Sequence, residues 1–290
     1  MDIGNPIDFT GRAVLVTGGT KGIGASIAEA FLSAGADVLV CGRNEPPKPP
    51  GSGTRQAHFR ATDVRDPAAA AALVDTAVER FGRLDVLVNN AGGSPDADAA
   101  TASPRFVEKI VALNLLAPFY VAQAANRIMQ GQSDGGSVIN IGSVCAHTPQ
   151  PGTAAYAAAK AGLLTLTRAL ALEWAPKVRV NHITTGLIRT ESAAPVYGED
   201  GGAAVAAVIP MRRMAVPDDV ARACLYLAGG LAPYVSGADL AVHGGGEVPA
   251  RFVASKGGQG SREAGIAVGD GAPAARTEGG HTPGQPFSSP

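Results

Sequence analysis

Three side chains in the second half of the sequence have types and spacing that suit proton transfer. Tyr156 and Lys160 are four residues apart, so on a helix they share one face, where the lysine charge favours the phenolate. A phenol has an ordinary pKa of about 10 and needs such help near neutral pH. Ser143, thirteen residues before Tyr156, offers a hydroxyl that can bind a carbonyl oxygen. A solvated helix face also explains the Tyr–Lys spacing, so the surrounding elements must decide.

The elements around these residues follow the alternation of an α/β protein. Short apolar runs predict strands at residues 13–16, 37–41, 58–61, 84–88, 137–141, 178–183 and 238–242. Helices are predicted from the turn after the first strand to about residue 32, from 67 to 81, and from about 153 to 174. Strands separated in this way form a parallel sheet, so the sequence predicts a doubly wound α/β fold in a single domain over about residues 1–250.

Two stretches interrupt this alternation. Residues 45–53 (EPPKPPGSG) contain four prolines, so they are predicted to form an extended loop in place of a helix. Beyond about Arg251 the sequence is rich in glycine, proline and serine and has few apolar clusters. Residues 251–290 are therefore predicted to be a disordered tail.

A glycine-rich turn joins the first predicted strand to the first helix. Residues 17–24 read TGGTKGIG. A diphosphate at such a junction requires a tight turn, a close approach of the backbone, and amides with a helix dipole that face the anion. Gly18, Gly22 and Gly24 fit these tasks. The placement predicts a dinucleotide site, against the alternative of an ordinary glycine turn.

The end of the second predicted strand indicates which dinucleotide binds. Sites for NAD place a carboxylate there, where it pairs with the ribose 2′-hydroxyl. This strand ends Val-Cys-Gly-Arg, without an acid. Arg43 suits a 2′-phosphate instead, and Lys21 in the glycine turn adds a second positive charge. Each alone reads as a surface cation, but together they favour NADP(H) over NAD(H).

Composition and charge exclude several classes of protein. The net charge of −1 provides no basic field for nucleic acid or an anionic membrane. Three cysteines without CxxC spacing and five dispersed histidines predict no metal site and no disulfide, as expected of a reduced cytoplasmic protein. The N-terminus lacks the pattern of a secretory signal, and the absence of a run of about 18 apolar residues predicts no membrane-spanning helix.

Together these motifs resemble the short-chain dehydrogenase/reductase family, of the TGxxxGxG and YxxxK type, over about residues 8–247. The resemblance rests on TGGTKGIG at 17–24, Asp63 after the third strand, NNAG at 89–92, Asn114, Ser143 and YAAAK at 156–160, in this order. It implies a Rossmann sheet of seven parallel strands, a homotetramer or homodimer, and a small carbonyl or alcohol as substrate.

The resemblance also implies roles for individual residues. Asn114 would hold a water that links Lys160 to solvent, Asp63 would bind the adenine amino group, and Asn89 would support the strand beside the cofactor. The catalytic set would be Asn114, Ser143, Tyr156 and Lys160. The cofactor-binding set would be Gly18, Thr20, Lys21, Gly22, Ile23, Gly24, Arg43, Asp63, Val64, Asn90, Ala91, Gly92, Tyr156, Lys160, Gly186, Ile188 and Thr190.

Several positions depart from the family pattern. Thr185 stands where the family usually has proline before Gly186, which predicts a less rigid loop over the nicotinamide. His243 replaces an acidic residue near the last strand and is interpreted as structural. Cys145 and His147, just after Ser143, are candidates to line the substrate pocket, although a histidine in a loop often only faces solvent.

The predicted function is hydride transfer between NADP(H) and a carbonyl or secondary alcohol. The expected substrate lid, about residues 187–214, is rich in alanine, which favours a roomy apolar pocket for a 3-oxoacyl thioester or a cyclic ketone; a sugar or a small ketone stays open. A second hypothesis is a nucleotide-sensing protein that has kept the fold without catalysis. A sugar-nucleotide epimerase or dehydratase is disfavoured, because the sequence lacks a large C-terminal substrate domain.

Overall fold

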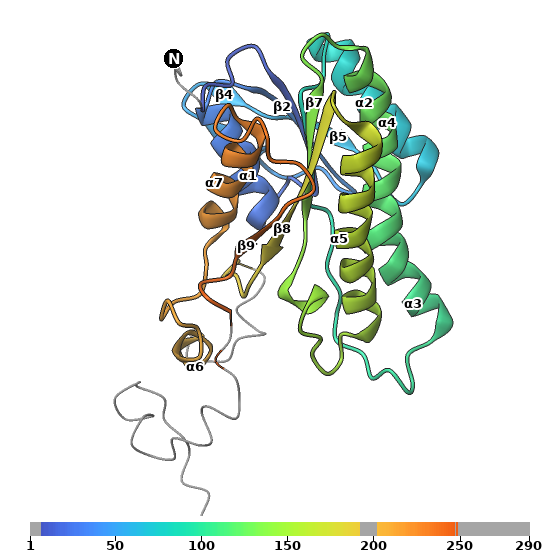
Figure 1. Cartoon of the computed structure of the whole chain (residues 1–290), viewed down its shortest axis with the longest axis vertical. Coiled ribbons are helices and arrows are strands. Elements are labelled where there is room, and N and C mark those ends of the chain that lie inside the picture. Colours follow the sequence, from blue (N-terminus) through green and yellow to red (C-terminus); the bar gives the residue numbers. More distant parts are fainter. Residues whose placement is uncertain (1–6, 192–201, 247, 249–290) are drawn as a thin grey trace, which may run out of the picture. The chain divides into compact units, whose positions relative to one another are not determined.

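Seven parallel strands form one sheet that carries helices on both faces (Figure 1). The computed structural model describes residues 7–191, 202–246 and 248. The strands of the sheet are β1 (Ala13–Thr17), β2 (Asp37–Gly42), β5 (His58–Ala61), β6 (Val86–Asn89), β7 (Gly136–Ile141), β8 (Val178–Thr185) and β9 (Asp239–Val242). Their order, β5-β2-β1-β6-β7-β8-β9, confirms the predicted doubly wound sheet.

Two apolar cores, one on each face of the sheet, are formed where the helices pack against the strands. The longer helices are α1 (Gly22–Ser33), α2 (Pro67–Phe81), α4 (Ala117–Gly131), α5 (Ala154–Trp174) and α7 (Pro217–Ala228). α1 packs with α7 on one face, and α2, α4 and α5 cover the other (Figure 1). Because successive side chains of a strand point to opposite faces, Val14 and Val16 of β1 join the first core and Leu15 joins the second.

Capping residues explain why α2 has the predicted bounds. The Asp66 carboxylate accepts hydrogen bonds from the amides of Ala68 (2.9 Å) and Ala69 (3.4 Å), and Pro67 occupies the first turn. Gly82, with φ of 76°, ends the helix in the left-handed region that favours glycine.

A π turn interrupts the helix between β6 and β7. α3 (Pro104–Val111) leads into residues Ala112–Leu116, where the Ala117 amide bonds the carbonyl of Ala112, five residues back. The prediction placed no helix in this part of the chain. Within residues 104–131 a window of 18 residues reaches a mean hydropathy of 1.2, as a membrane span would, but Val121 and Met129 are fully buried against the sheet, so this is a core helix.

The proline-rich crossover contains a short hairpin rather than a plain extended loop. β3 (Gly51–Ser52) pairs with β4 (Arg55–Gln56) in antiparallel fashion, and β3 packs against α1. The expected absence of a long helix between β2 and β5 is confirmed, because β2 leads to β5 through this hairpin alone. Within the expected lid, the structure describes α6 (Ala203–Ala207); the lid residues 192–201 and the expected tail at 251–290 lie outside the described residues.

The two ends of the parallel strands have different roles. At their amino ends, the Asp85 carboxylate accepts a hydrogen bond from the Ala13 amide (2.8 Å) and ion pairs with Arg12 and Arg83, which ties β1 to β6. At their carboxyl ends, the chain leaves β1 toward β2 on one side, whereas β6 lies on the other. Such a switch point opens a crevice for ligands at the carboxyl ends of the strands.

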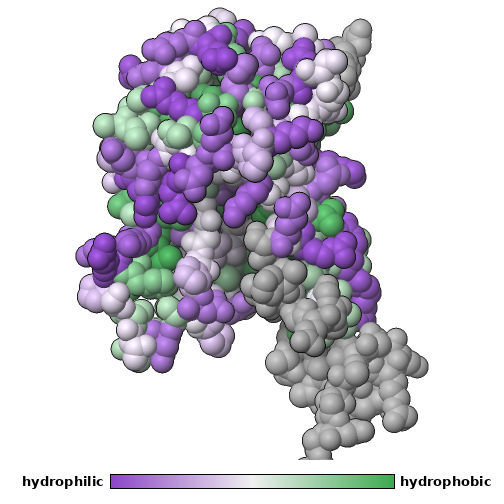
Figure 2. Space-filling model, turned by 180° about the vertical axis from the view of Figure 1, so that it is seen from behind, coloured by the Kyte–Doolittle hydropathy of each residue, from purple (hydrophilic) through white to green (hydrophobic). Residues whose placement is uncertain are grey.

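The surface seen from behind carries mostly hydrophilic side chains with hydrophobic ones between them (Figure 2). Among the described residues, the most exposed large apolar or aromatic side chains are Tyr234 (101%) and Leu172 (84%).

Candidate active site

The glycine turn after β1 is shaped by close backbone contacts. A Cβ atom at Gly18, where φ is 61°, would lie 3.0 Å from Cα of Ala91. The side-chain amide of Asn90 donates to the carbonyls of Thr17 and Gly18, both at 3.0 Å, and thereby locks the turn to the end of β6. A Cβ atom at Gly24 would overlap the Gly18 carbonyl oxygen. These glycines therefore leave the amides at the start of α1 open to an anion, as a dinucleotide site requires.

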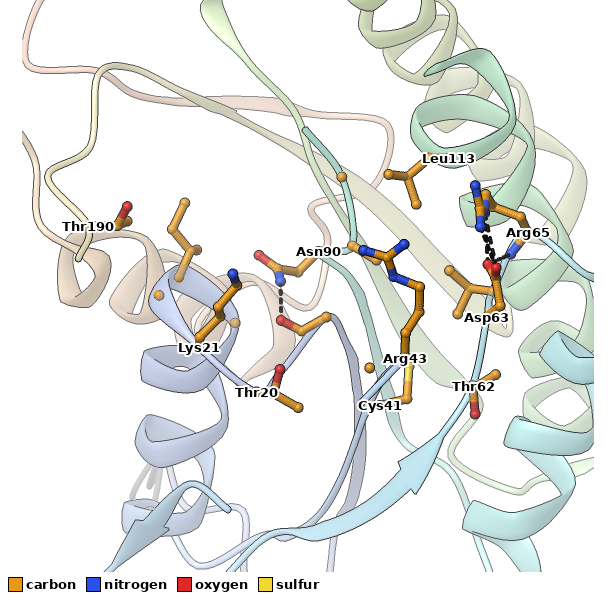
Figure 3. A pocket seen from close by; sticks show the side chains of 18 residues that line it. Thr20, Lys21, Cys41, Arg43, Thr62, Asp63, Arg65, Asn90, Leu113 and Thr190 are labelled. Carbon is orange, nitrogen blue, oxygen red and sulfur yellow. Dashed lines mark hydrogen bonds and ion pairs between the residues drawn. The ribbon is translucent and has the colours of Figure 1, made fainter. Parts of the chain in front are cut away.

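A cleft of about 400 Å³ lies over this turn at the switch point of the sheet (Figure 3). It is lined by most of the predicted cofactor residues: Gly18, Thr20, Lys21, Gly22, Ile23, Gly24, Arg43, Asp63, Val64, Asn90, Ala91, Gly92 and Thr190. Cys41, Gly42, Thr62, Arg65 and Leu113 also line it and were not predicted. The size and glycine lining fit the diphosphate and adenosine parts of a nicotinamide nucleotide.

Two arginines and one aspartate occupy the end of the cleft beyond β2 and β5. Arg43 rises from the end of β2 between Asn90 and Asp63, and Lys21 stands apart at the start of α1 (Figure 3). Arg65 forms a two-pronged ion pair with Asp63, with Nε 2.9 Å from Oδ1. This hydrogen bonding from Arg65 lowers the pKa of the Asp63 carboxyl, and the charge of Arg43 adds to the effect. The sequence analysis did not single out Arg65, although a basic residue two positions after Asp63 is a signal for an ion pair with that carboxylate.

Four of the predicted cofactor residues are not part of the cleft lining. Tyr156 and Lys160 lie on α5, and Ile188 is buried in the core beside α1 and α7. Gly186 packs closely on the last strand, because a Cβ atom there would lie 2.8 Å from Cα of His243. Thr185 donates a hydrogen bond to the carbonyl of Gly142 (2.8 Å), so it ties β8 to the segment that leads to Ser143.

Lys160 is buried beside the cleft wall. Its Nζ donates to the carbonyl of Ile141 (2.8 Å) and lies 5.7 Å from the centre of the Tyr156 ring. A Cβ atom at Gly92, which lines the cleft, would lie 3.3 Å from the same Nζ. Burial lowers the pKa of Lys160 to about 8. Lys160 therefore connects the phenol of Tyr156 with the cofactor cleft.

Asn114 sits in the π turn on the other side of Gly92. Its side-chain amide donates to the carbonyls of Gly93 (3.0 Å) and Ile110 (2.9 Å), and its Oδ1 accepts from the Gly93 amide (2.9 Å). A Cβ atom at Gly92 would lie 2.8 Å from that Oδ1. Both amide hydrogens are thus committed to backbone carbonyls, and a further partner could only donate to Oδ1.

Ser143 follows the end of β7 and caps a short 3₁₀ turn over residues Val144–Ala146. Its Oγ accepts a hydrogen bond from the Cys145 amide (3.2 Å), which leaves the hydroxyl hydrogen for an oxygen outside the turn. The turn packs against α5, the helix of Tyr156 and Lys160. Cys145 is buried and is 7% exposed.

A buried polar ladder, which the sequence did not reveal, fixes α5 to the sheet. Asn89 of β6 donates to the side-chain oxygen of Asn140 on β7 (2.9 Å), and Asn140 donates to the hydroxyl of Thr167 on α5 (2.9 Å). All three side chains are at most 3% exposed. Such fully buried hydrogen bonds resist sliding of the helix, so they hold Tyr156 and Lys160 at one height above the strand ends.

A second cleft, of about 350 Å³, begins at the residue after Ser143. Its walls come from the 3₁₀ turn and from the ends of β8 and β9: Val144, His147, Thr148, Thr184, Asp239, Ala241, His243 and Gly246. His243, interpreted as structural from the sequence, therefore lies in a cleft wall. In the described part of the chain, its Nδ1 is buried without a hydrogen-bond partner.

Comparisons with known proteins find one matching family model, several relatives at 34% identity or more, and solved structures of the same fold. The family described as enoyl-(acyl carrier protein) reductase matches residues 18–247. D-threitol dehydrogenase of Mycolicibacterium smegmatis is 36% identical over 241 residues, 81% of this chain and 92% of that protein. The 3-oxoacyl-(acyl-carrier-protein) reductase FabG of Chlamydia pneumoniae is 34% identical over 246 residues, 82% of this chain and 98% of that one. A short-chain type dehydrogenase/reductase from Mycobacterium marinum superposes with a TM-score of 0.76 at 30% identity, over 85% of this chain and 100% of that chain.

Proposed function

Because the chain belongs to the short-chain dehydrogenase/reductase family, we propose that it transfers a hydride between NADP(H) and a carbonyl or secondary alcohol, with Tyr156 as the proton donor and acceptor. Membership makes it an oxidoreductase that acts on alcohol or carbonyl groups with a nicotinamide nucleotide, NAD or NADP. The observation that carries the proposal is the position of Lys160, whose Nζ borders both the Tyr156 ring and the Gly92 wall of the cofactor cleft.

The residues of the chain divide the work of the reaction. When bound, the nicotinamide nucleotide supplies or accepts the hydride. Ser143 donates its free hydroxyl hydrogen to the substrate oxygen, and Tyr156 delivers a proton to that oxygen during reduction or removes it during oxidation. The Lys160 charge favours the phenolate of Tyr156. Asn114 presents Oδ1 to a water that exchanges protons with solvent beside Gly92.

The preference for NADP(H) rests on charge at the adenosine end of the cleft. No carboxylate stands at the end of β2, where Gly42 is followed by Arg43, and Arg43 and Lys21 both line the cleft from separate elements (Figure 3). Arg43, at the end of β2, can make a charge-assisted contact with a 2′-phosphate that a 2′-hydroxyl lacks, and Lys21 adds positive charge to the same cleft. Arg65 is held by Asp63, so it serves first to fix that carboxylate.

The substrate is a small carbonyl or alcohol. The apolar composition of the lid favours a 3-oxoacyl thioester or a cyclic ketone, and the likeness to FabG supports the first, whereas the likeness to D-threitol dehydrogenase supports a polyol. A cytoplasmic homotetramer or homodimer is proposed, with the exposed Leu172 and Tyr234 as contacts between copies.

The test is a panel of ketones and secondary alcohols assayed with NADPH and NADH, or their oxidised forms, in parallel. Nucleotide-dependent turnover with a preference for NADP(H) is the expected result. A protein that binds NADPH tightly but turns over no member of the panel would support the nucleotide-sensing alternative.

A further inference from the structure

We propose that His147, held in place by Asp239 and the buried His182, binds a hydroxyl group of the substrate next to the reacting carbon, so the substrate is a diol, polyol or hydroxyketone. This inference rests on the proposed hydride transfer and names the substrate class of that site. It concerns the second cleft, which begins at the residue after Ser143.

The arrangement starts from a buried imidazole for which the neighbouring strand leaves room. A Cβ atom at Gly142 would overlap the Cε1 and Nε2 atoms of His182, so only glycine at position 142 permits this ring. His182 is fully buried, and its Nδ1 lies 2.8 Å from Oδ1 of Asp239. Burial lowers the pKa of His182 despite the carboxylate, and the positive charge of Lys160 acts in the same direction. Neutral His182 therefore donates from Nδ1 to Asp239.

Asp239 in turn orients His147. Its Oδ1 also accepts from the Thr184 hydroxyl (2.7 Å), and its Oδ2 lies 2.9 Å from Nε2 of His147. Burial raises the pKa of Asp239, but the hydrogen bonds from His182, Thr184 and His147 outweigh burial and leave that pKa below its ordinary value. The ionised carboxylate therefore keeps the proton of His147 on Nε2, and Asp239 and His182 act as positioning residues.

The free nitrogen of His147 then has a defined chemical character. A neutral imidazole with its proton on Nε2 is an acceptor at Nδ1. Within residues 7–191, 202–246 and 248, the His147 ring forms hydrogen bonds through Nε2 alone, to Asp239 (2.9 Å) and Thr184 (3.2 Å), and the side chain is 46% exposed in a cleft wall. His147 follows Ser143 by a single 3₁₀ turn. In this proposal a substrate oxygen is bound at Ser143, and the hydroxyl on the neighbouring carbon extends into the second cleft, where Nδ1 of His147 accepts its hydrogen bond.

Other occupants of this cleft fit the residues less well. A metal ion is disfavoured, since in the described part of the chain no three His, Cys, Asp or Glu residues are grouped to hold one. A cation would seek the carboxylate, but both Asp239 oxygens already accept hydrogen bonds from neighbouring side chains. The side chain of a simple acyl ketone offers His147 no donor, so it would gain no hydrogen bond from Nδ1.

The experiment compares matched alcohols with the full-length protein and its preferred oxidised nucleotide at about pH 8.5, where imidazole is neutral. The pairs are butane-2,3-diol with butan-2-ol and cyclohexane-1,2-diol with cyclohexanol. We expect kcat/KM to favour each diol by up to about tenfold, the net worth of one intermolecular hydrogen bond. In His147→Gln, the side-chain amide can still donate to Asp239 but offers no acceptor at the Nδ1 position, so the diol preference should disappear.

His147→Asn and His58→Gln complete the design. The shorter side chain of His147→Asn would keep a polar atom near the Nδ1 position, so part of the diol preference should return. His58 lies on β5 and lines neither cleft, so its substitution should leave kcat/KM for the diols and for the mono-alcohols unchanged.

Equal kcat/KM for diols and mono-alcohols in the unmodified protein, or an equal loss for both in His147→Gln, overturns this inference and leaves hydride transfer standing. A protein that oxidises none of the four alcohols overturns the inference, and NADP⁺ binding with ketone reduction then decides the proposed function separately.

Discussion

Gly142 and His182 share one space, because a Cβ atom at position 142 would overlap the imidazole ring of a residue forty positions later. The buried ring of His182 on β8 therefore fills the space that a side chain at position 142, just before Ser143, would occupy. Gly142 does not adopt a positive φ, so the requirement for glycine here is one of space alone.

Gly142→Ala should destabilise the fold through this overlap. Overpacking of a well-packed core costs about 1–3 kcal/mol, which corresponds to a Tm lower by roughly 2–4 °C per kcal/mol in a chain of this size. Urea unfolding of Gly142→Ala, His182→Ala and the double variant measures the effect. The double variant should lose less free energy of unfolding than the two single losses together, and strictly additive losses would contradict the shared space.

Tyr156→Phe should abolish measurable turnover, a loss of at least ~100-fold in kcat, because the proton donor is removed. NADPH affinity should stay nearly intact, since Tyr156 does not line the cofactor cleft. Steady-state kinetics and a fluorescence titration of NADPH separate the two effects. Full activity in the Phe variant would refute the proposed mechanism.

Arg43→Ala and Lys21→Ala should each weaken NADPH binding by about tenfold, the typical worth of one hydrogen bond to a charged group. NADH affinity should change little in either variant, because NADH has no 2′-phosphate. Arg222→Ala is the control, since Arg222 pairs with Asp218 on the exposed side of α7. A protein that prefers NADH before any substitution would rule out these roles.

The free energy of unfolding should depend on the protonation of Lys160 at alkaline pH. Burial lowers the pKa of Lys160 from 10.5 to about 8, so between these values the unfolded chain binds more protons than the native state. The Lys160 contribution therefore makes the protein more stable as pH rises through this window, by at most ~1.4 kcal/mol per pH unit. Burial raises the pKa of the Cys41 thiol to about 11, which works in the opposite direction.

Lys160→Met isolates the lysine from such opposing groups. Urea unfolding at pH 7.5 and at about pH 10 gives a stability difference for each protein, and this difference should be more positive for the unmodified chain. The same difference in both proteins would mean that the lysine keeps an ordinary pKa.

Local signals in the sequence predicted much of the fold and of the cofactor cleft. α2 has its predicted bounds because Pro67 and Gly82 mark its ends, and the glycine turn follows from the motif after β1. Features that depend on the pairing of strands far apart in the sequence could not be predicted. The bond between Asn89 and Asn140 follows from the register of β6 with β7, and Gly142 meets His182 only because β7 lies beside β8.

The π turn over residues 112–116 makes the site sensitive to the local length of the chain as well as to its side chains. A π turn holds about one residue more than an α turn, and each residue of a helix turns the chain by about 100°. Deletion of a single residue here would rotate α3 relative to α4 and swing Leu113 and Asn114 away from the cleft and from Gly92, while α4 kept its place against the sheet. Two chains with identical residues at every position of the site, but different by one residue in this helix, would not share the same active site.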